Sequence, residues 1–139
     1  MAPRVIVDAS VALSWVLPGG VSDKTLALRD RCAEDPAFTL VVPPIFWSEV
    51  ANALWAAVRR HRLDRIMATM AIGALLDYGF ETWAPDILEC MDIAFEQEIA
   101  VYDASYLQLA KETDSTLWTI DQLMSKAAVA LGIPVEPAA

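Results

Sequence analysis

Short apolar runs alternate along this chain with longer segments in which apolar residues recur every three or four positions. The short runs are rich in β-branched and aromatic residues, which favour extended backbone. They predict strands at residues 5–7, 40–42, 80–83, 100–101, 117–119 and 134–135. The longer segments have the helical period. They predict helices at 9–17, 22–34, from Pro43-Pro44 to about 60, and at 63–76, 87–98, 103–112 and 121–131.

Capping and breaking residues fit these boundaries. Pro18-Gly19-Gly20 is expected to stop the first helix, and Ser22 to cap the second, which ends at Asp35-Pro36. Gly132 is expected to close the last helix from the position after its C-cap. Repeated strand–helix units predict an α/β fold of three layers, α/β/α, with a parallel sheet covered on both faces. No linker divides the chain, so we expect one domain over residues 1–139.

Four acidic residues stand where an apolar run gives way to the next element. Asp8, Asp103 and Asp121 follow runs interpreted as strands, and Glu49 lies within the apolar segment 44–50. Ligands of open α/β sheets bind beyond the carboxyl ends of the strands. Carboxylates gathered there repel one another unless a cation or shared protons hold them together. The pattern therefore indicates a site for divalent metal that acts on phosphate.

Each aspartate also has an ordinary interpretation, because Asp at the start of a helix commonly caps its first turn. Glu49 has no such role, since it lies inside a predicted helix. Apolar residues surround it on or beside the same helix face, and no Lys or Arg lies three or four residues away. A carboxylate on a core-facing stripe is costly unless it is paired, protonated or bound to metal. Asn52, one turn on, is expected to donate a hydrogen bond to it.

Hydroxyl residues accompany three of the acids. The tripeptide Asp-Ala-Ser occurs at 8–10 and again at 103–105, so Ser10 and Ser105 fall in the first turn of a helix. Thr119 places a third hydroxyl near Asp121. We expect these hydroxyls to orient water or the metal-binding carboxylates.

The segments that carry these residues resemble the four motifs of PIN-domain nucleases, and most closely those of VapC toxins. They are VIVDAS at 5–10, SEVANAL at 48–54, VYDASYL at 101–107 and LWTID at 117–121. The four motifs occur in the right order and spacing over nearly the whole chain.

The resemblance implies a compact α/β fold and an endoribonuclease that depends on Mg²⁺ or Mn²⁺. It also implies a homodimer that a small VapB-like antitoxin inhibits. By motif, Asp8, Glu49, Asp103 and Asp121 are expected to be the catalytic and metal-binding residues. One departure is that Ile120 and Gln122 flank Asp121 where the family often has further acidic or polar residues, which puts a second metal in doubt.

Charge narrows the possible partners. Ten basic against 19 acidic residues give a net charge of −9, which argues against a protein that coats nucleic acid non-specifically. The basic cluster Arg59, Arg60, Arg62 and Arg65 has two interpretations. It is either a solvated helix end that complements the helix dipole or a grip on the RNA backbone.

The apolar content is also unusual. At 56%, with five Trp, it exceeds that of a typical soluble domain, so some apolar surface is expected to meet a second copy or another protein. Core packing is the expected use of most of Trp15, Trp47 and Trp55. A groove for an antitoxin helix, or stacking on RNA bases, are the alternatives.

Other features exclude or rank alternatives. Cys32 and Cys90 are isolated and His61 is the single histidine, which excludes paired-histidine nuclease chemistry and histidine-rich zinc sites. The apolar stretch 5–17 contains Asp8 and is too short to span a bilayer, so we expect a cytoplasmic protein. A haloacid-dehalogenase-type phosphatase would need a second Asp where Ser10 stands, and a phospho-receiver domain would need a paired Lys. A PIN nuclease of housekeeping RNA processing remains an alternative to the toxin, and a binding domain with a decayed site is disfavoured because all four acids are present.

Overall fold

A computed structural model describes residues 3–18 and 22–137 and shows a five-stranded sheet at the centre of the molecule. The strand order is β3-β2-β1-β4-β5, and every neighbouring pair is parallel. The strands are β1 (Arg4–Val7), β2 (Thr39–Val42), β3 (Glu81–Thr82), β4 (Thr116–Trp118) and β5 (Val135–Glu136).

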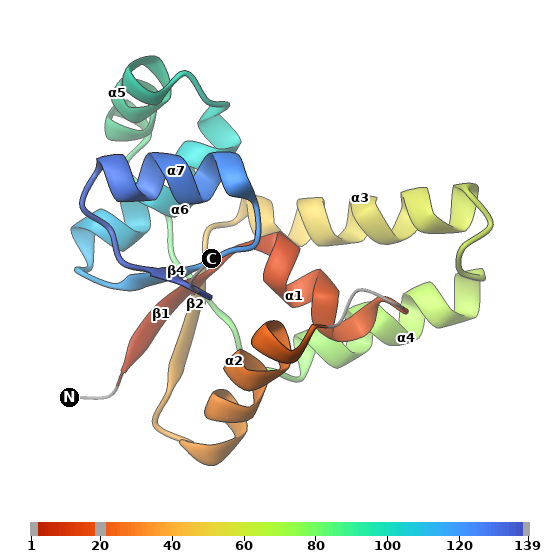
Figure 1. Ribbon diagram of the computed structural model, residues 1–139. Coiled ribbons are helices and arrows are strands. Elements are labelled where there is room, and N and C mark those ends of the chain that lie inside the picture. The colour runs from red at the N-terminus through yellow and green to blue at the C-terminus, as the bar shows by residue number, and fades with distance from the viewer. Residues whose placement is uncertain (1–2, 19–21, 138–139) are drawn as a thin grey trace.

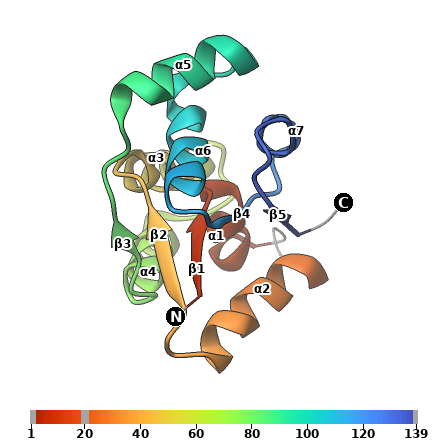
Figure 2. The same cartoon turned by 90° about the vertical axis from the view of Figure 1, so that its left-hand side faces the viewer.

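Helices cover both faces of this sheet, as Figures 1 and 2 show from two directions. They are α1 (Ala9–Val16), α2 (Asp23–Glu34), α3 (Ile45–Arg59), α4 (Arg65–Leu76), α5 (Ile87–Gln97), α6 (Val101–Glu112) and α7 (Gln122–Ala130). Helices α1 to α4 pack with one another on one face, and α5 to α7 on the other, where α6 lies against β1 and β4. The predicted three-layer α/β/α fold is confirmed.

The chain changes direction across the sheet between β1 and β4. From β1 it moves outward to β2 and β3, and then crosses back by α5 and α6 to β4, on the other side of β1. Helices that follow β1 and β4 therefore leave the same edge toward opposite faces. A junction of this kind is where open α/β sheets bind ligands, because the loops diverge and leave a crevice.

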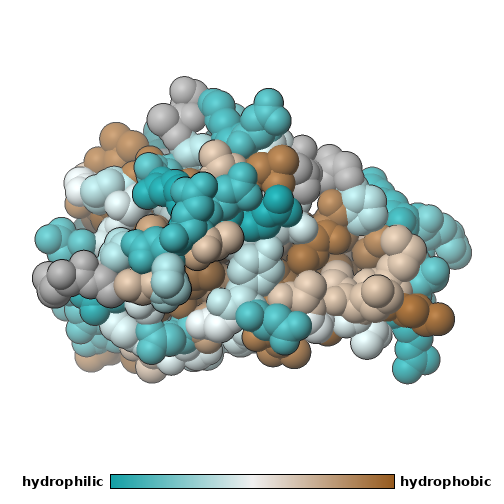
Figure 3. All heavy atoms as spheres, turned by 90° about the horizontal axis from the view of Figure 1, so that it is seen from below, coloured by the Kyte–Doolittle hydropathy of each residue, from teal (hydrophilic) through white to brown (hydrophobic). Residues whose placement is uncertain are grey.

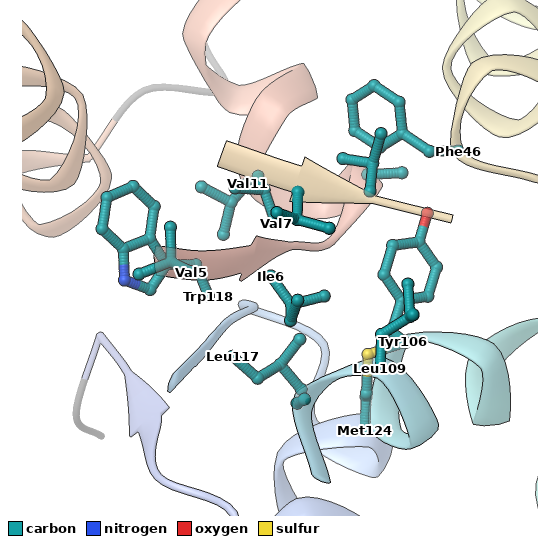
Figure 4. Close-up of a cluster of buried hydrophobic side chains, with 14 of the residues drawn as sticks. Val5, Ile6, Val7, Val11, Phe46, Tyr106, Leu109, Leu117, Trp118 and Met124 are labelled. Atoms are coloured by element: carbon teal, nitrogen blue, oxygen red, sulfur yellow. The ribbon is translucent and has the colours of Figure 1, made fainter. Parts of the chain in front are cut away.

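The core is formed by the central strands and the helices that sandwich them. Val5, Ile6 and Val7 of β1 and Leu117 and Trp118 of β4 are almost fully buried. Figure 4 shows them between Phe46 of α3 on one side and Tyr106, Leu109 and Met124 of α6 and α7 on the other. Because β1 is covered on both faces, its apolar run is continuous rather than alternating, as the sequence indicated.

Local capping residues behave as predicted where the structure describes them. Ser22 and Thr25 form a reciprocal capping box at the start of α2, and α2 ends before Asp35. Gly132 has a positive φ of 74° after α7, a conformation that glycine adopts without steric cost. α1 ends at Val16, but Gly19 and Gly20, predicted to stop it, lie outside the described residues.

One predicted strand is wrong. Residues 100–101 do not join the sheet, since Val101 is the first residue of α6 and Ala100 is its N-cap. α5 ends at Gln97, and Glu98 adopts a left-handed conformation, so only a short connection separates the two helices. Val101 and Tyr102 are exposed, which a buried strand would not allow. α6 thus begins two residues earlier than expected, and Asp103 lies within its first turn rather than after a strand.

Apolar side chains also gather on the outer surface. α3 and α4 form a hairpin that projects from the body, and Figure 3 shows hydrophobic side chains along this projecting part with hydrophilic ones beside them. Ile66, Met67 and Met70 of α4 are among the exposed residues there. None of the helices in the described ranges is long and apolar enough to cross a membrane.

The tryptophans divide between core and surface. Trp15 is buried, stacks on Tyr78 at 5.1 Å between ring centroids, and donates its indole N–H to the Thr25 carbonyl. Trp47 is partly buried against Phe46. Trp55 is the exception to the expected core packing: it is 60% exposed on α3, with the guanidinium of Arg59 over its ring.

Candidate active site

Asp8 lies directly after β1, at the junction where the chain changes direction. It occupies the N-cap position of α1, yet its side chain makes no capping hydrogen bond. Its backbone N–H donates to the Trp118 carbonyl, which holds the end of β1 against the end of β4. The carboxylate is only 4% exposed. The ordinary capping role therefore does not account for Asp8.

Two hydroxyls hold the Asp8 carboxylate instead. Ser10 Oγ donates to Oδ2 at 2.6 Å, and Thr119 Oγ1 donates to the same oxygen at 2.8 Å. Ser10 comes from α1 and Thr119 from the loop after β4, so the two donors reach Asp8 from both sides of the junction. Two donors on one oxygen fix the orientation of the carboxylate. They also leave its second oxygen, Oδ1, outside this pair of contacts.

Asp121 has a structural role that Asp8 lacks. Its Oδ1 accepts a hydrogen bond from the Met124 N–H and caps α7, as the ordinary interpretation expected. Its own N–H donates to Thr119 Oγ1 at 3.0 Å. Thr119 therefore connects the two aspartates, since its hydroxyl contacts the side chain of Asp8 and the backbone of Asp121.

Asp103 approaches the junction from α6. It is partly buried in the first turn of that helix, and α6 packs on β1 and β4. Ser105, which was expected to act near it, donates its hydroxyl to the Tyr102 carbonyl one turn back. This bond within the helix uses the hydroxyl proton of Ser105, so the structure gives it no contact with the carboxylates.

Glu49 on α3 is the fourth acid, and its surroundings differ from the expected ones. It is partly buried rather than fully buried, and it has a hydrogen-bond partner. The donor is the Tyr106 hydroxyl, 2.7 Å from Oε1, and not Asn52, whose side chain is exposed. The expected hydrogen bond from Asn52 to Glu49 is therefore wrong, although the two residues lie one turn apart on α3. The spacing of Tyr106, three residues after Asp103, was the signal in the sequence that could have placed it on this face of α6.

The carboxylates act on one another electrostatically. Burial raises the pKa of Asp8, and the negative charge of Asp121 raises it further against the lowering effect of the Ser10 and Thr119 hydroxyls. Burial also raises the pKa of Glu49, the hydrogen bond from Tyr106 lowers it, and the charges of Asp8 and Asp103 raise it further. For Asp103, burial raises the pKa first, followed by the charges of Asp121 and Asp8. The four acids predicted from separate motifs thus lie in one electrostatic neighbourhood.

Among the described residues, the groups that shift the pKa values of Asp8, Glu49 and Asp103 include no cation, so no positive charge offsets these carboxylates. The ion pairs Arg29–Asp30 and Arg31–Glu136 lie elsewhere. The cluster Arg59, Arg60, Arg62 and Arg65 is exposed at the far end of the α3–α4 hairpin. Ten residues of helix separate Arg59 from Glu49, a rise of roughly 15 Å. The structure therefore places the four acids in one network of electrostatic interactions and keeps the basic cluster apart from them.

Comparison with known proteins identifies the family. The sequence model of the PIN domain matches residues 5–130 of this chain. The chain belongs to the PIN domain family. Ribonuclease VapC3 of Pyrobaculum aerophilum is 25% identical to this PIN domain over 135 residues, which cover 94% of this chain and 99% of that protein. The predicted resemblance to PIN domains and VapC proteins is confirmed.

Solved structures agree on the fold. The crystal structure of PAE2754 from Pyrobaculum aerophilum superposes on this PIN domain with a TM-score of 0.73 at 25% identity, covering 97% of this chain and 85% of that one. VapBC2 from Rickettsia felis, crystallised with a DNA fragment from its promoter, gives a TM-score of 0.64. Its identity is 11%, with 96% of this chain and 97% of that one covered, so this similarity concerns the fold.

The carboxylate oxygens of the four acids in this PIN domain are chemically suited to bind a hard divalent cation. Mg²⁺ and Mn²⁺ prefer carboxylate oxygens, and the raised pKa values of Asp8, Glu49 and Asp103 arise from burial and like charge that a cation would relieve. Over residues 3–18 and 22–137, however, no three Asp, Glu, His or Cys side chains are already close enough together to hold a metal ion. Of the four acids, Asp8 is buried, Glu49 and Asp103 are partly buried, and Asp121 is exposed.

The raised pKa of Asp8 leads to a prediction about stability. Because the native pKa lies above the ordinary 3.8, the native state binds this proton more tightly than the unfolded chain. The stabilisation from Asp8 is thus complete below pH 3.8 and is lost as the pH rises through the native pKa. Asp8→Asn, whose amide oxygen can still accept both hydroxyls, should raise the free energy of unfolding at neutral pH. Chemical denaturation in the presence of a chelator measures this.

The gain from Asp8→Asn should vanish below pH 3.8, where the unsubstituted carboxyl is protonated in both states. Asp92→Asn, an exposed carboxylate on α5, is the matched control and should change little. A variant at Asp8 that is less stable than the unsubstituted protein at neutral pH would contradict this account of the site.

Proposed function

We propose that this PIN domain is a metal-dependent endoribonuclease and the toxin of a type II toxin–antitoxin system. The observation that carries the proposal is the gathering of Asp8, Glu49, Asp103 and Asp121 at the β1–β4 junction, where burial and like charge act together and no cation offsets them. Similarity to Ribonuclease VapC3 over nearly the full length of both chains supports RNA as the substrate.

The four acids take different roles in this proposal. Asp8, which Ser10 and Thr119 orient, would hold Mg²⁺ or Mn²⁺ together with Glu49 and Asp103. Asp121 already caps α7 through Oδ1, so it would complete the site with its other oxygen or through water. The ion supplies charge neutralisation at the phosphate and a lowered pKa for an attacking water.

The reaction is hydrolysis of an RNA phosphodiester bond. The oxygen of water forms a bond to phosphorus in line with the 3′-oxygen, whose bond to phosphorus breaks. The 3′-oxygen leaves with a proton as a hydroxyl, and the phosphate stays on the 5′ end of the downstream fragment. The carboxylates would hold a cation that positions the phosphate, and Ser10 and Thr119 would keep Asp8 in one orientation during the displacement.

Membership in the PIN family favours this chemistry over a phosphatase of the haloacid dehalogenase type. That reaction would need an acid at position 10, where Ser10 donates a hydrogen bond to Asp8. A housekeeping PIN nuclease shares the same site chemistry. It differs in lacking a cognate antitoxin, so a neighbouring reading frame for a short DNA-binding protein discriminates the two.

The purified, partner-free protein should cut total bacterial RNA in Mg²⁺ or Mn²⁺ into discrete fragments with 5′-phosphate ends. Asp8→Asn and Asp103→Asn should each abolish cleavage while circular dichroism shows an intact fold, because each removes one negative ligand. Chelation should have the same effect. Sequencing of the fragment ends, with Asp92→Asn as an active control, measures the outcome. Cleavage that persists in both site variants would refute the assignment of these carboxylates.

The surface supports two protein partners. α5 exposes Ile87, Leu88, Met91 and Phe95 on one side, an apolar stripe suited to a second copy of the chain. Between α3 and α4 lies a groove of about 530 Å³, lined mainly by apolar residues and by Trp55, with Arg65 at its edge. An amphipathic helix with acidic flanks, from an antitoxin, would match this groove.

Light scattering should give the mass of two chains for the free protein and a larger mass once the antitoxin is added. Phe95→Lys should yield a monomer because it places a charge in the α5 stripe, and it should still bind antitoxin. Trp55→Asp should remain a dimer but lose the antitoxin. Each variant is thus the control for the other. A free chain that is monomeric, or a Trp55→Asp complex of unchanged mass, would contradict the corresponding partner surface.

The exposed arginines at the tip of the hairpin are proposed to contact the RNA backbone outside the acidic pocket. Their separation from the carboxylates suits a strand that passes the site and continues along α3. Replacing Arg59, Arg60 and Arg62 by Gln in the Asp103→Asn background should weaken RNA binding and lower the slope of log K against log salt by roughly 2, since each contact to single strands contributes about 0.7.

Fluorescence anisotropy at several salt concentrations measures this slope. Lys111→Gln with Lys126→Gln, two exposed cations on α6 and α7, is the control and should leave the slope unchanged. The same slope in the arginine variant and the control would show that the cluster is only a solvated helix end.

A further inference from the structure

We infer that Tyr106 is a positioning residue whose hydroxyl holds Glu49 in the orientation required for metal binding. This inference rests on the proposed function, since it gives Tyr106 a role toward a ligand of the proposed ion. The hydroxyl donates a hydrogen bond of 2.7 Å to Glu49 Oε1, between helices on opposite faces of the sheet and 57 positions apart in the chain.

The Tyr106 ring is held rigidly. It is fully buried, and Figure 4 shows it among the core side chains, with its hydroxyl oxygen pointing toward the side where Phe46 of α3 lies. Phe46 is also fully buried and stands one turn before Glu49 on α3. The hydroxyl therefore sits where the apolar core ends and the acidic site begins.

Glu49 needs such a support more than the other acids do. A glutamate side chain has one more rotatable bond than aspartate, and burying or ordering it costs conformational entropy. Asp8 is fixed by two hydroxyls and Asp121 by a backbone N–H of α7. Within the described chain, the Tyr106 hydroxyl is the donor that fixes Glu49. It binds Oε1, and Oε2 is not part of this hydrogen bond.

Tyr106 also links the two acids that come from helices. It lies three residues after Asp103 on α6, so both side chains leave the same face of that helix. The hydrogen bond from Tyr106 to Glu49 thus sets the position of the Glu49 carboxylate on α3 relative to the Asp103 carboxylate on α6. Hydrogen-bond partners of metal ligands typically contribute 10- to 100-fold to metal affinity.

The test is Tyr106→Phe, which removes the hydroxyl and keeps the ring. Isothermal titration calorimetry of the metal-free protein with Mn²⁺ should show affinity weakened by roughly tenfold or more, with the fold intact by circular dichroism. Tyr78→Phe, which removes the hydroxyl of a tyrosine stacked on Trp15, is the matched control and should bind Mn²⁺ normally. In a Glu49→Gln background, Tyr106→Phe should cause no further loss.

A second measurement needs no substitution. The Tyr106 hydroxyl proton, buried and hydrogen-bonded, should give a slowly exchanging NMR signal that shifts when Mg²⁺ is added. An unchanged signal would overturn the inference. The inference would also be overturned if Tyr106→Phe bound Mn²⁺ with normal affinity. The same would hold if Tyr106→Phe lowered the Mn²⁺ affinity equally in the Glu49→Gln background and in the unsubstituted protein. Failure of the unsubstituted protein to bind Mn²⁺ or cut RNA would instead overturn the proposed function, and the role of Tyr106 with it.

Discussion

The parallel pairing of β1 with β4 is the interaction on which the site depends. It joins the first strand of the chain to a strand more than a hundred positions later, and it brings the Asp8 carboxylate within 2.8 Å of the Thr119 hydroxyl across 111 positions of sequence. The backbone bond from Asp8 N–H to the Trp118 carbonyl closes the junction at its edge. Because the chain leaves β1 and β4 toward opposite faces, the junction opens into the crevice that the carboxylates line.

This junction places negative charge at the border of an apolar core. Val7 and Trp118, which immediately precede the two loops, are fully buried, and the carboxylate of Asp8 follows them almost as deeply. Burial and like charge make the ionised form of the site unfavourable, which is the opposite of what stability alone would select. Such a conflict between local chemistry and stability is characteristic of functional sites, where a ligand supplies the missing interaction.

The distribution of charge over the rest of the molecule suits a site that a cationic ligand neutralises. The chain has 10 basic against 19 acidic residues. Its basic cluster, Arg59, Arg60, Arg62 and Arg65, lies at the tip of a helical hairpin, away from the four acids. An arginine inside the pocket would pair with the carboxylates and compete with a metal ion. The hairpin instead separates the two charge types along α3, while Tyr106, a neutral donor, supports Glu49 without adding positive charge.

The sequence by itself determined the layers of the fold, the order of the four acids and most helix boundaries, because these depend on periodicity, capping and apolar runs within a few residues. It could not tell that Asp121 caps a helix while Asp8 does not, since both follow a strand. Nor could it show that Val101 begins a helix, that Glu49 pairs with Tyr106 rather than Asn52, or that Ser105 bonds within its own helix. Tertiary structure decided the contacts of Asp8 and Glu49, because sheet pairing and helix packing bring together groups that are far apart in the chain, and local patterns carry no information about those distances. The start of α6 and the bond of Ser105 are local, but a short apolar run fits a strand and the first turn of a helix equally well.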